Sequence, residues 1–325
     1  MKLAILDDYQ RVALQCADWE RLRRRGVEPS VFHEAFASLD EAAGKLAPFE
    51  IVILMRERTP FPRALIERLP KLKLVVLTGV RSPSLDAAAC SERGIPVSHT
   101  RQGNSTASTA ELTWGLIIAA ARDLARAERG MRVGRWHEGV AGGMILEGRR
   151  LGLLGLGKLG SRVARVGAAF GMEVAAWSEN LTGERALAAG ALHLPKDELL
   201  ATSDVISIHL VLSERTRGLI GAAEFARMKR GAILVNTSRG PIVDQAAMIE
   251  ALRTGRLGHA ALDVYEREPL PQDHPLRTLD NVTLAPHLGY VSADTYRTFY
   301  QDAVENIEAW LDGNPVRLIN PEASR

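Results

Sequence analysis

The segment between residues 151 and 170 constrains the fold more than any other part of the sequence. An apolar run of strand length, Leu151–Leu154, leads directly into the loop Gly155–Gly160 (GLGKLG), and a helical spacing of apolar residues follows. A strand, a G-x-G-x-x-G turn and a helix in this order form the phosphate-binding half of a βαβ unit. The helix N-terminus attracts a pyrophosphate. We therefore predict a parallel α/β fold with a dinucleotide site built on Gly155, Gly157 and Gly160.

The rest of the chain alternates strand-length apolar runs with helical patterns, which favours parallel sheets covered by helices. A helix signal from about Asn104 to Gly130 separates two such series, and a helical segment, Ala303–Leu311, returns to the first. We predict two doubly wound parallel-sheet domains of Rossmann-like type, residues 1–100 with 291–325, and an inserted domain of residues 101–290. Strands are expected at Lys2–Leu6, Ile51–Met55, Leu74–Leu77, Leu151–Leu154, Glu173–Trp177, Val205–His209, Ile233–Asn236, Ala260–Asp263 and Val282–Ala285.

Composition excludes several classes of protein. The 325 residues carry 41 basic and 39 acidic side chains, a net charge of +2, too balanced for a chain that mainly binds nucleic acid or anionic membrane. The longest apolar run, Trp114–Ala121, is about half of a membrane span. Cys16 and Cys90 form neither a disulfide framework nor a metal-ligand pattern. We expect a soluble, cytoplasmic protein without a metal site, whose basic run Arg21–Arg25 is a solvated helix end.

The residues after the strand Glu173–Trp177 should read the adenosine ribose of the dinucleotide. They are Ser178, Glu179 and Asn180, with no arginine beside them. A carboxylate accepts both ribose hydroxyls and repels a 2′-phosphate, which prefers arginine. We therefore predict NAD as the cofactor, with NADP as the alternative, and an exposed loop charge as the other interpretation of Glu179.

Three charged residues follow three later strands of the inserted domain. Arg239 follows the strand ending at Asn236, Glu268 the strand ending at Asp263, and His287 the strand ending at Ala285. The carboxyl ends of parallel strands meet at one edge of a sheet, where ligands bind. Each residue alone would be interpreted as a loop charge, but together they indicate a catalytic site.

The sequence at this point resembles the D-isomer-specific 2-hydroxyacid dehydrogenases. The resemblance covers nearly the whole chain and rests on four stretches: Gly155–Gly160, Met228–Gly240, Ala261–Pro269 and Ala285–Gly289. It implies an NAD(H)- or NADP(H)-dependent homodimer with a flavodoxin-like substrate domain, an NAD-binding domain and a cleft between them. It also implies an arginine at Arg239, a glutamate at Glu268 and an acid–base histidine at His287. Cofactor contacts are implied at Gly155, Gly157, Lys158, Leu159, Gly160, Ser178, Glu179, Thr237, Ser238, Asp263 and Gly289.

The implied chemistry suits these side chains. Nicotinamide supplies a hydride. His287 would protonate the carbonyl oxygen of a 2-keto acid and deprotonate the alcohol in reverse. A neighbouring Glu268 would favour the charged imidazole. The planar guanidinium of Arg239 would bind the substrate carboxylate and polarise the C2 carbonyl.

Four residues of the first domain are candidate substrate contacts: Arg56, Gly79, Val80 and Arg81. The family's first lobe usually carries a Gly-Val-Gly loop, and here Arg81 replaces the second glycine. Arg81 either adds a cation for a dianionic substrate or points to solvent, and Arg56 either meets substrate or is a surface charge. Tyr290 and Val211 are further departures, at positions where the family commonly has a small residue and a proline.

Alternative functions remain open at this stage. Glu268 argues against a relative that acts on formate. A phosphoglycerate dehydrogenase-type activity is one alternative to a small 2-hydroxy acid as substrate. A non-enzymatic, NAD-sensing corepressor is another, because such proteins can retain the whole Arg–Glu–His set.

Overall fold

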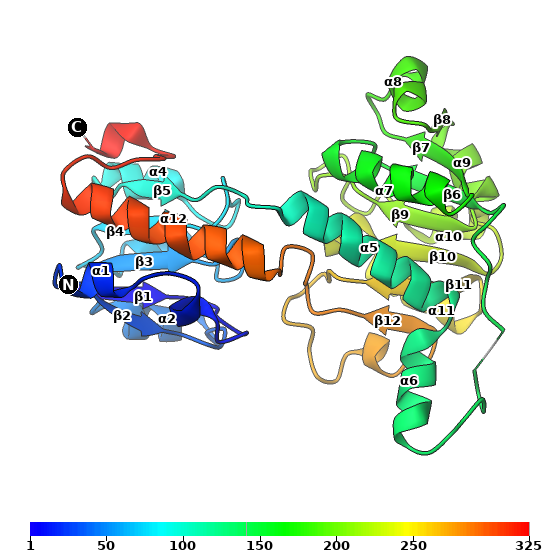
Figure 1. The fold of residues 1–325 in the computed structure, drawn as a ribbon, viewed down its shortest axis with the longest axis horizontal. Coiled ribbons are helices and arrows are strands. Elements are labelled where there is room, and N and C mark those ends of the chain that lie inside the picture. The colour runs from blue at the N-terminus through cyan, green and yellow to red at the C-terminus, as the bar shows by residue number, and fades with distance from the viewer. Residues whose placement is uncertain (141, 325) are drawn as a thin grey trace. The chain divides into compact units, whose positions relative to one another are not determined.

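The computed structural model describes residues 1–140 and 142–324, and the chain divides into two compact units (Figure 1). Unit 1 contains Met1–Asn104 and Ser292–Arg325, and unit 2 contains Ser105–Val291. Unit 2 is therefore an insertion between the two segments of unit 1. Each unit has its own parallel sheet, so each is described by itself below.

The sheet of unit 1 has the strand order β2-β1-β3-β4-β5, and all its pairs are parallel. This is the doubly wound order of flavodoxin-like domains, in which ligands bind outside the carboxyl ends of the strands. The central strands are continuous apolar runs, as expected for strands that are buried on both faces. The strands are β1 (Lys2–Ile5), β2 (Glu28–Val31), β3 (Ile51–Leu54), β4 (Leu74–Leu77) and β5 (Val97–His99).

Helices cover both faces of this sheet. Val52 and Leu54 pack with α2, α3 and α4 in one core cluster, and the alternating residues Ile51 and Ile53 point to the other face. The long helix α12 contacts β4, β5 and α1. The helices are α1 (Glu20–Arg23), α2 (Leu39–Leu46), α3 (Arg63–Ile66), α4 (Ala87–Glu92) and α12 (Ala293–Leu311), with 3-10 turns η1 (Ala13–Gln15) and η4 (Pro321–Ser324).

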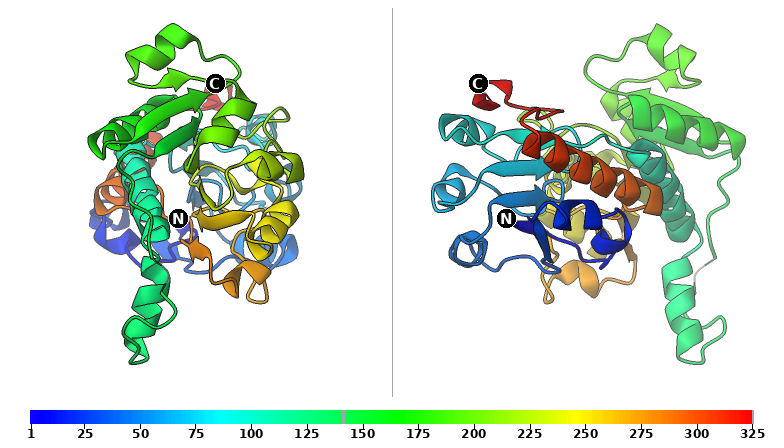
Figure 2. Two further views of the ribbon diagram at one scale, coloured as in Figure 1. Left: turned by 90° about the vertical axis from the view of Figure 1, so that its right-hand side faces the viewer. Right: turned by 60° about the vertical axis from the view of Figure 1, so that its left-hand side comes forward.

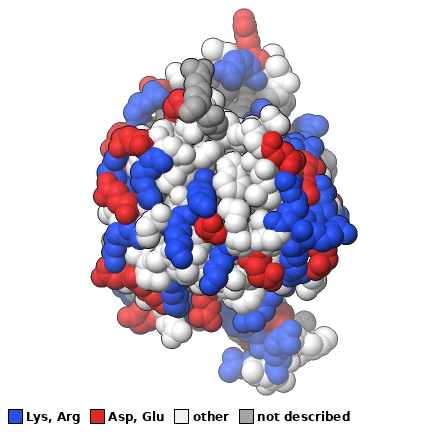
Figure 3. Space-filling view, turned by 90° about the vertical axis from the view of Figure 1, so that its left-hand side faces the viewer, with Lys and Arg blue, Asp and Glu red and all other residues white. Residues whose placement is uncertain are grey.

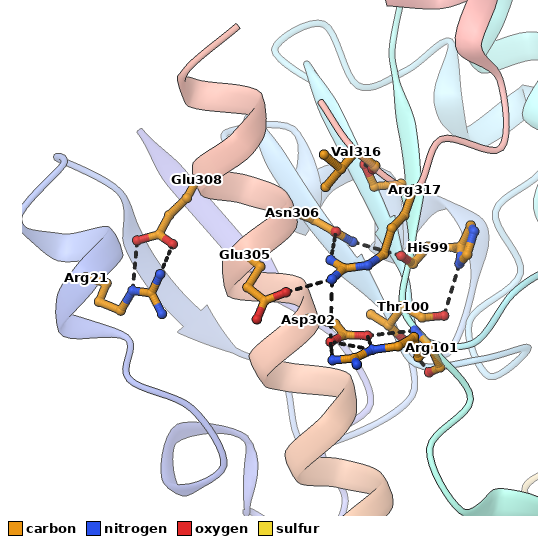
Figure 4. A network of polar contacts seen from close by, with 11 residues as sticks. Arg21, His99, Thr100, Arg101, Asp302, Glu305, Asn306, Glu308, Val316 and Arg317 are labelled. Atoms are coloured by element: carbon orange, nitrogen blue, oxygen red, sulfur yellow. Dashed lines mark hydrogen bonds and ion pairs between the residues drawn. The ribbon is translucent and has the colours of Figure 1, made fainter. Parts of the chain in front are cut away.

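Polar contacts tie α12 to the rest of unit 1 (Figure 4). Asp302 is fully buried and accepts hydrogen bonds from the backbone N–H of Arg101 at 2.8 Å and from its guanidinium Nη2 at 2.6 Å. Asn306 donates to the carbonyl oxygen of His99 at 2.9 Å. These bonds fix the segment that follows β5 against the helix.

The basic run Arg21–Arg25 lies at the exposed end of α1, as expected for a solvated helix end, and two of its arginines also form ion pairs. Arg21 forms an ion pair with Glu308, and Arg25 donates to the Asp312 carboxylate at 2.5 Å. Both carboxylates belong to α12 or its C-terminal cap. The face of unit 1 drawn in Figure 3 intersperses basic and acidic side chains in the same way.

The sheet of unit 2 has the order β12-β11-β10-β9-β6-β7-β8, again with parallel pairs throughout. Counted from β6, this is the strand order of dinucleotide-binding domains with one further strand at the edge. The strands are β6 (Arg150–Leu154), β7 (Glu173–Trp177), β8 (Leu192–His193), β9 (Val205–Ile208), β10 (Ala232–Asn236), β11 (Leu257–Leu262) and β12 (Val282–Leu284).

Two apolar cores lie on opposite faces of this sheet. Helices cover both faces, as the ribbon views show (Figure 2). On one face α5 packs on α7, where the Trp114 and Phe170 rings stack with centroids 4.9 Å apart. On the other face α9, α10 and α11 pack on the strands. The helices are α5 (Ser105–Ala121), α6 (Leu124–Arg132), α7 (Lys158–Ala169), α8 (Gly183–Ala188), α9 (Lys196–Thr202), α10 (Ala222–Arg227) and α11 (Gln245–Arg253), with 3-10 turns η2 (Gly240–Ile242) and η3 (Pro275–Arg277).

The single long helix expected over residues 104–130 is wrong, because the chain forms two helices there. Asp123 has a left-handed conformation, with φ of 51° and ψ of 37°, between the end of α5 and the start of α6. A left-handed residue ends a helix, and aspartate tolerates this conformation better than most side chains. The second helix, α6, buries none of its residues and extends from unit 2 (Figure 1). No helix among the described residues is long and apolar enough to cross a membrane.

Candidate active site

The glycine loop between β6 and α7 has the geometry of a phosphate cradle. Gly155 has φ of +105°, and a Cβ at Gly160 would lie 2.2 Å from the carbonyl oxygen of Gly155. Both positions therefore need glycine for the turn itself. A Cβ at Gly157 would meet nothing within 4 Å, so this glycine leaves open space at the N-cap of α7. The residues fit a bound pyrophosphate.

The other predicted cofactor residues of this half lie at the same edge of the sheet. Trp177 pairs with Leu154 in register, so Ser178 and Glu179 follow β7 beside the glycine loop. Ser178 is half-buried and Glu179 is exposed. Lys158 is exposed and Leu159 half-buried in the first turn of α7.

The turn after β10 holds Arg239. The buried side chain of Asn236 accepts a hydrogen bond from the Ser238 N–H at 3.0 Å and donates to the carbonyl oxygen of Arg239 at 3.0 Å. Thr113 of α5 is hydrogen-bonded to Thr237 at 2.9 Å. Thr237 and Ser238 thus build the turn that presents the half-buried Arg239 at the edge of the sheet.

Glu268 and His287 form a hydrogen-bonded pair. His287 Nδ1 and Glu268 Oε2 are 2.5 Å apart, and the other carboxylate oxygen of Glu268 accepts the Tyr265 N–H at 3.0 Å. The two side chains are 20% and 24% exposed, so the pair is partly shielded from water. His287 has φ of 54°, a conformation that non-glycine residues adopt mainly where function or packing demands it.

Arg239 lies at the same sheet edge as this pair. The strands β10, β11 and β12 are neighbours, and the three residues follow their carboxyl ends. A Cβ at Gly240 would lie 2.0 Å from the carbonyl oxygen of Tyr265, so the two loops touch. The structure therefore places the loops that carry these three residues at one edge of the sheet.

Asp263, a predicted cofactor contact, forms hydrogen bonds within the chain. Its buried carboxylate accepts the Leu288 N–H at 2.6 Å and the Gly289 N–H at 2.9 Å. Thr109 of α5 donates to the carbonyl oxygen of Gly289 at 2.8 Å. These bonds fix the loop that carries His287. The ring of Tyr290 packs edge-on against the His287 ring, with centroids 5.9 Å apart, so its bulk lies beside the histidine.

His209 is a residue of this edge that sequence reasoning did not select. It follows β9, and a Cβ at Gly155 would lie 2.8 Å from its carbonyl oxygen. Burial lowers the pKa of His209 to about 3, so the ring stays neutral. Among the described residues Nδ1 has no hydrogen-bond partner, and Nε2 lies 2.9 Å from Ser207 Oγ. The sequence pattern that could have selected His209 is its position directly after an apolar strand, β9, which pairs with β6. Val211, two residues later, is 83% exposed.

The candidate substrate residues lie at the carboxyl edge of the sheet of unit 1. A Cβ at Gly79 would lie 2.5 Å from Arg56 Nη1, so the guanidinium rests on the glycine backbone. The backbone N–H of Arg56 donates to Thr78 Oγ1 at 2.9 Å. Arg56 and Gly79 are thus in contact, whereas Val80 and Arg81 are exposed.

These features define a dinucleotide-dependent α/β oxidoreductase with a histidine–carboxylate pair. Residues 114–289 match the family model described as the NAD-binding domain of D-isomer specific 2-hydroxyacid dehydrogenases. The chain belongs to the D-isomer specific 2-hydroxyacid dehydrogenase family. It is an NAD-dependent oxidoreductase that acts on the CH–OH group of 2-hydroxy acids and reduces 2-keto acids in reverse.

Several known proteins are similar over most of their length. The glyoxylate reductase of Aeropyrum pernix is 42% identical over 266 residues, which are 79% of this chain and 79% of that protein. The hydroxypyruvate reductase of Thermotoga maritima is 37% identical over 266 residues, covering 81% of this chain and 85% of that protein. The crystal structure of a phosphoglycerate oxidoreductase from Vibrio cholerae superposes with a TM-score of 0.88 at 38% identity, covering 96% and 99% of the two chains.

Proposed function

We propose that Arg239, Glu268 and His287 catalyse the reversible reduction of a small 2-keto acid to a D-2-hydroxy acid. The observation that carries this assignment is the 2.5 Å contact between His287 Nδ1 and Glu268 Oε2 at the edge of the NAD-binding sheet. When bound, NAD(H) supplies or accepts the hydride at C2. His287 donates a proton through Nε2 to the carbonyl oxygen during reduction and takes it back during oxidation.

Glu268 and Arg239 have different tasks in this scheme. Glu268 orients the imidazole through Nδ1 and stabilises its charged form, because a carboxylate in hydrogen-bond contact favours an imidazolium. Arg239 binds the substrate carboxylate with its planar guanidinium and polarises the C2 carbonyl. The Asp263 carboxylate holds the Leu288–Gly289 backbone and so keeps His287 in place.

Replacing Glu268 with glutamine should move the pH profiles of the two reaction directions. The neutral amide stabilises the imidazolium less than a carboxylate does. Keto-acid reduction needs a charged His287, so its activity should fall away at a lower pH than in the unmodified enzyme. Hydroxy-acid oxidation needs a neutral ring and should extend to lower pH. Steady-state kcat/KM between pH 5 and 9 measures both, and coincident profiles in a folded variant would show that the side chains are uncoupled.

The substrate domain assigned to unit 1 is also our proposal. Arg56, with its guanidinium on Gly79, would bind the carboxylate of the keto acid together with the backbone N–H groups of Val80 and Arg81, whereas the Gly79 N–H donates to Thr100 Oγ1 at 2.8 Å. Relatives named glyoxylate reductase and hydroxypyruvate reductase support a small substrate. The Vibrio cholerae phosphoglycerate oxidoreductase supports the alternative, a substrate with a second anionic group that the exposed Arg81 would attract. The two possibilities are distinguished by kcat/KM for oxaloacetate and for 2-ketobutyrate, measured in the unmodified enzyme and in Arg81→Ala. If Arg81 attracts a second anionic group, the substitution should lower kcat/KM for oxaloacetate and leave that for 2-ketobutyrate unchanged.

Glu179 supports a preference for NAD over NADP. Its exposed carboxylate follows β7 beside the glycine loop and would repel a 2′-phosphate. We expect NADH to give the higher kcat/KM, and a preference of the unmodified enzyme for NADPH would contradict this assignment. The contacts expected from Lys158, Leu159, Ser178, Thr237, Ser238 and Gly289 belong to the same proposal.

The homodimer is supported by exposed apolar side chains on one part of unit 2. Helix α6 and the segment after it expose Met131 by 53%, Val133 by 69% and Trp136 by 68%. Such a group, at the end of a helix that buries none of its residues and just after it, suits contact with a second copy of the chain. We expect light scattering to give twice the chain mass, and Met131→Glu with Trp136→Glu to give the monomer mass. The matched control is Leu187→Glu on α8, also exposed, which should stay dimeric. A monomeric unmodified protein would contradict the proposal.

The cytoplasm remains the location that we propose. The two cysteines are free, and burial raises the pKa of the Cys90 thiol to about 12, which makes it unreactive. Free thiols suit a reducing compartment. Recovery of the native protein in a compartment other than the cytoplasm on cell fractionation would contradict this location.

A further inference from the structure

Three neighbouring strands of unit 1 are each followed, two residues after the strand ends, by a residue with a left-handed backbone conformation. Asp7 after β1 has φ of 59°, Arg56 after β3 has φ of 54°, and Gly79 after β4 has φ of 90°. Glycine adopts this conformation freely, but aspartate and arginine do so at a cost. Such residues persist where surrounding contacts hold them, and they cluster at functional sites.

Contacts at both ends hold the turn that contains Arg56. The Arg58 N–H donates to the carbonyl oxygen of Met55 at 3.1 Å, which closes the turn. At its start the Arg56 N–H donates to Thr78 Oγ1. At its end Thr59 Oγ1 donates to Asp7 Oδ2 at 2.8 Å. Asp7 is 2% exposed, so this carboxylate is a buried anchor for the turn.

These contacts determine where the Arg56 side chain lies. Its Nη1 lies so close to Gly79 that a Cβ there would approach it to 2.5 Å. A shift of the turn by a fraction of this distance would lift the guanidinium from the glycine. Binding through a planar guanidinium depends on such placement.

We propose that Asp7 is a positioning residue for substrate binding, whose buried carboxylate fixes the turn of residues 55–59 and thereby keeps the Arg56 guanidinium on Gly79. This inference rests on the proposed role of Arg56 in binding the keto acid. Asp7 itself would not touch the substrate. Its contribution should therefore appear in KM and leave kcat nearly unchanged.

The ionisation of Asp7 gives this role a pH dependence. Burial raises the pKa of Asp7 to about 6, although the Thr59 hydrogen bonds, the charge of Arg58 and the Tyr9 hydroxyl act to lower it. The charged group facing Asp7 is Arg58, from the segment after β3, and the other titratable group is Tyr9, from its own segment. The carboxylate is charged at pH 7.5 and largely protonated at pH 5, where it anchors Thr59 more weakly.

The first test is Asp7→Asn in the full-length enzyme, with glyoxylate and 2-ketobutyrate as substrates and NADH saturating. At pH 7.5 we expect KM to rise about tenfold, the worth of one charge-assisted hydrogen bond, with kcat within about twofold. At pH 5 the ratio of the KM values of variant and enzyme should approach one, because Asp7 is then mostly protonated. The ratio cancels effects that both proteins share, including titration of His287.

Thermal stability gives a second measurement, in which Asp7→Asn should improve the protein although it weakens substrate binding. A carboxyl group whose pKa is raised on folding stabilises the fold below its unfolded pKa, near 3.9, and this is lost as pH rises through about 6. At pH 7.5 the charged, buried Asp7 therefore destabilises the fold relative to asparagine. Asp7→Asn should raise Tm by several degrees at pH 7.5 and by less at pH 5. A residue with only a structural role would not combine higher stability with weaker substrate binding.

Asp8 offers the matched control, because it is equally buried and differs in its contacts. Its carboxylate accepts the N–H groups of Val12 and Ala13 at 3.0 and 3.1 Å. Asp8→Asn should lower Tm and leave KM unchanged. If Asp7→Asn does not fold, Thr59→Val removes the same hydrogen bond from the other side and should also raise KM, with Thr59→Ser restoring it.

Arg56→Ala separates the failure of this inference from the failure of the proposed function. If Arg56→Ala raises KM and neither Asp7→Asn nor Thr59→Val does, the positioning role is wrong and the substrate role of Arg56 stands. If Arg56→Ala leaves KM unchanged, the proposed substrate contact itself is wrong. An increase in KM for Asp7→Asn that is equal at pH 5 and pH 7.5 would contradict the role of its ionisation.

Discussion

Replacing Arg239 with glutamine is expected to lower kcat/KM for every accepted keto acid by at least about a hundredfold, or ~3 kcal/mol. The guanidinium would contact the substrate in both the ground state and the transition state, so KM should rise and kcat should fall together. Glutamine retains much of the length of arginine and lacks its charge. The effect should therefore report the lost charge and not a cavity.

Two further variants sharpen the test at Arg239. Arg239→Lys keeps the charge and loses the planar pair of donors, so it should recover only part of the activity. Arg230→Gln changes an exposed arginine just before the amino end of the same strand, β10, and should leave kcat/KM unchanged. An Arg239→Gln enzyme with unaltered kcat/KM would remove Arg239 from the active site.

The largest effect on stability is expected at the pair Arg101 and Asp302 (Figure 4). The Asp302 side chain is fully buried and that of Arg101 is 67% exposed, so the arginine neutralises a carboxylate that water does not reach. Arg101→Ala leaves the buried carboxylate with the more distant Arg317, whose Nη2 lies 3.9 Å from Asp302 Oδ1, and should lower the free energy of unfolding. Urea unfolding at pH 7 measures this loss.

The pH dependence of this variant has a defined sign. Burial alone would raise the pKa of Asp302, but the hydrogen bonds from Arg101 and the charges of Arg317 and Arg101 together outweigh burial and hold the pKa below its usual value. The pair therefore stabilises the fold above the unfolded pKa, near 3.9, and this is lost as pH falls through the lower, folded pKa. In Arg101→Ala the deficit should shrink as the pH is lowered and Asp302 takes up a proton.

A double variant and a surface control test the same explanation. Arg101→Ala with Asp302→Asn removes the buried charge and should be less destabilised than Arg101→Ala alone. Asp294→Ala removes the carboxylate of an exposed ion pair with Arg297 on the same helix and should change stability by less than about 1 kcal/mol. An Arg101→Ala protein as stable as the unmodified one at pH 7 would show that Asp302 is not held by this pair.

The glycine loop and the Arg–Glu–His set were predictable from sequence because each follows a strand that is a buried apolar run. The edge position of Gly155, Arg239 and His287 is then a consequence of parallel pairing. The short outer strands were not predictable in this way. β8 has two residues, both exposed, and β2 contains Pro29 and a half-exposed pattern, so neither has the apolar signal of a central strand.

Contacts between residues distant in sequence could not be predicted from sequence patterns either. An aspartate after a strand, such as Asp263, is interpreted from sequence as a ligand contact. Only the fold shows that both its carboxylate oxygens accept N–H groups of the loop after β12. Asp7 and Thr59 are 52 residues apart and share no motif. The break at Asp123 depends on one backbone conformation, which composition does not determine.

The most direct test of the account is a panel of 2-keto acids with the purified enzyme, followed by loss of nicotinamide absorbance. The panel contains glyoxylate, hydroxypyruvate, 2-ketobutyrate and oxaloacetate, each with NADH and with NADPH, and His287→Gln is the matched control. We expect turnover of at least one keto acid, faster with NADH, giving the D-hydroxy acid and falling at least about a hundredfold in His287→Gln. Binding of NADH without turnover of any keto acid, or equal turnover in His287→Gln, would contradict the proposed catalytic function.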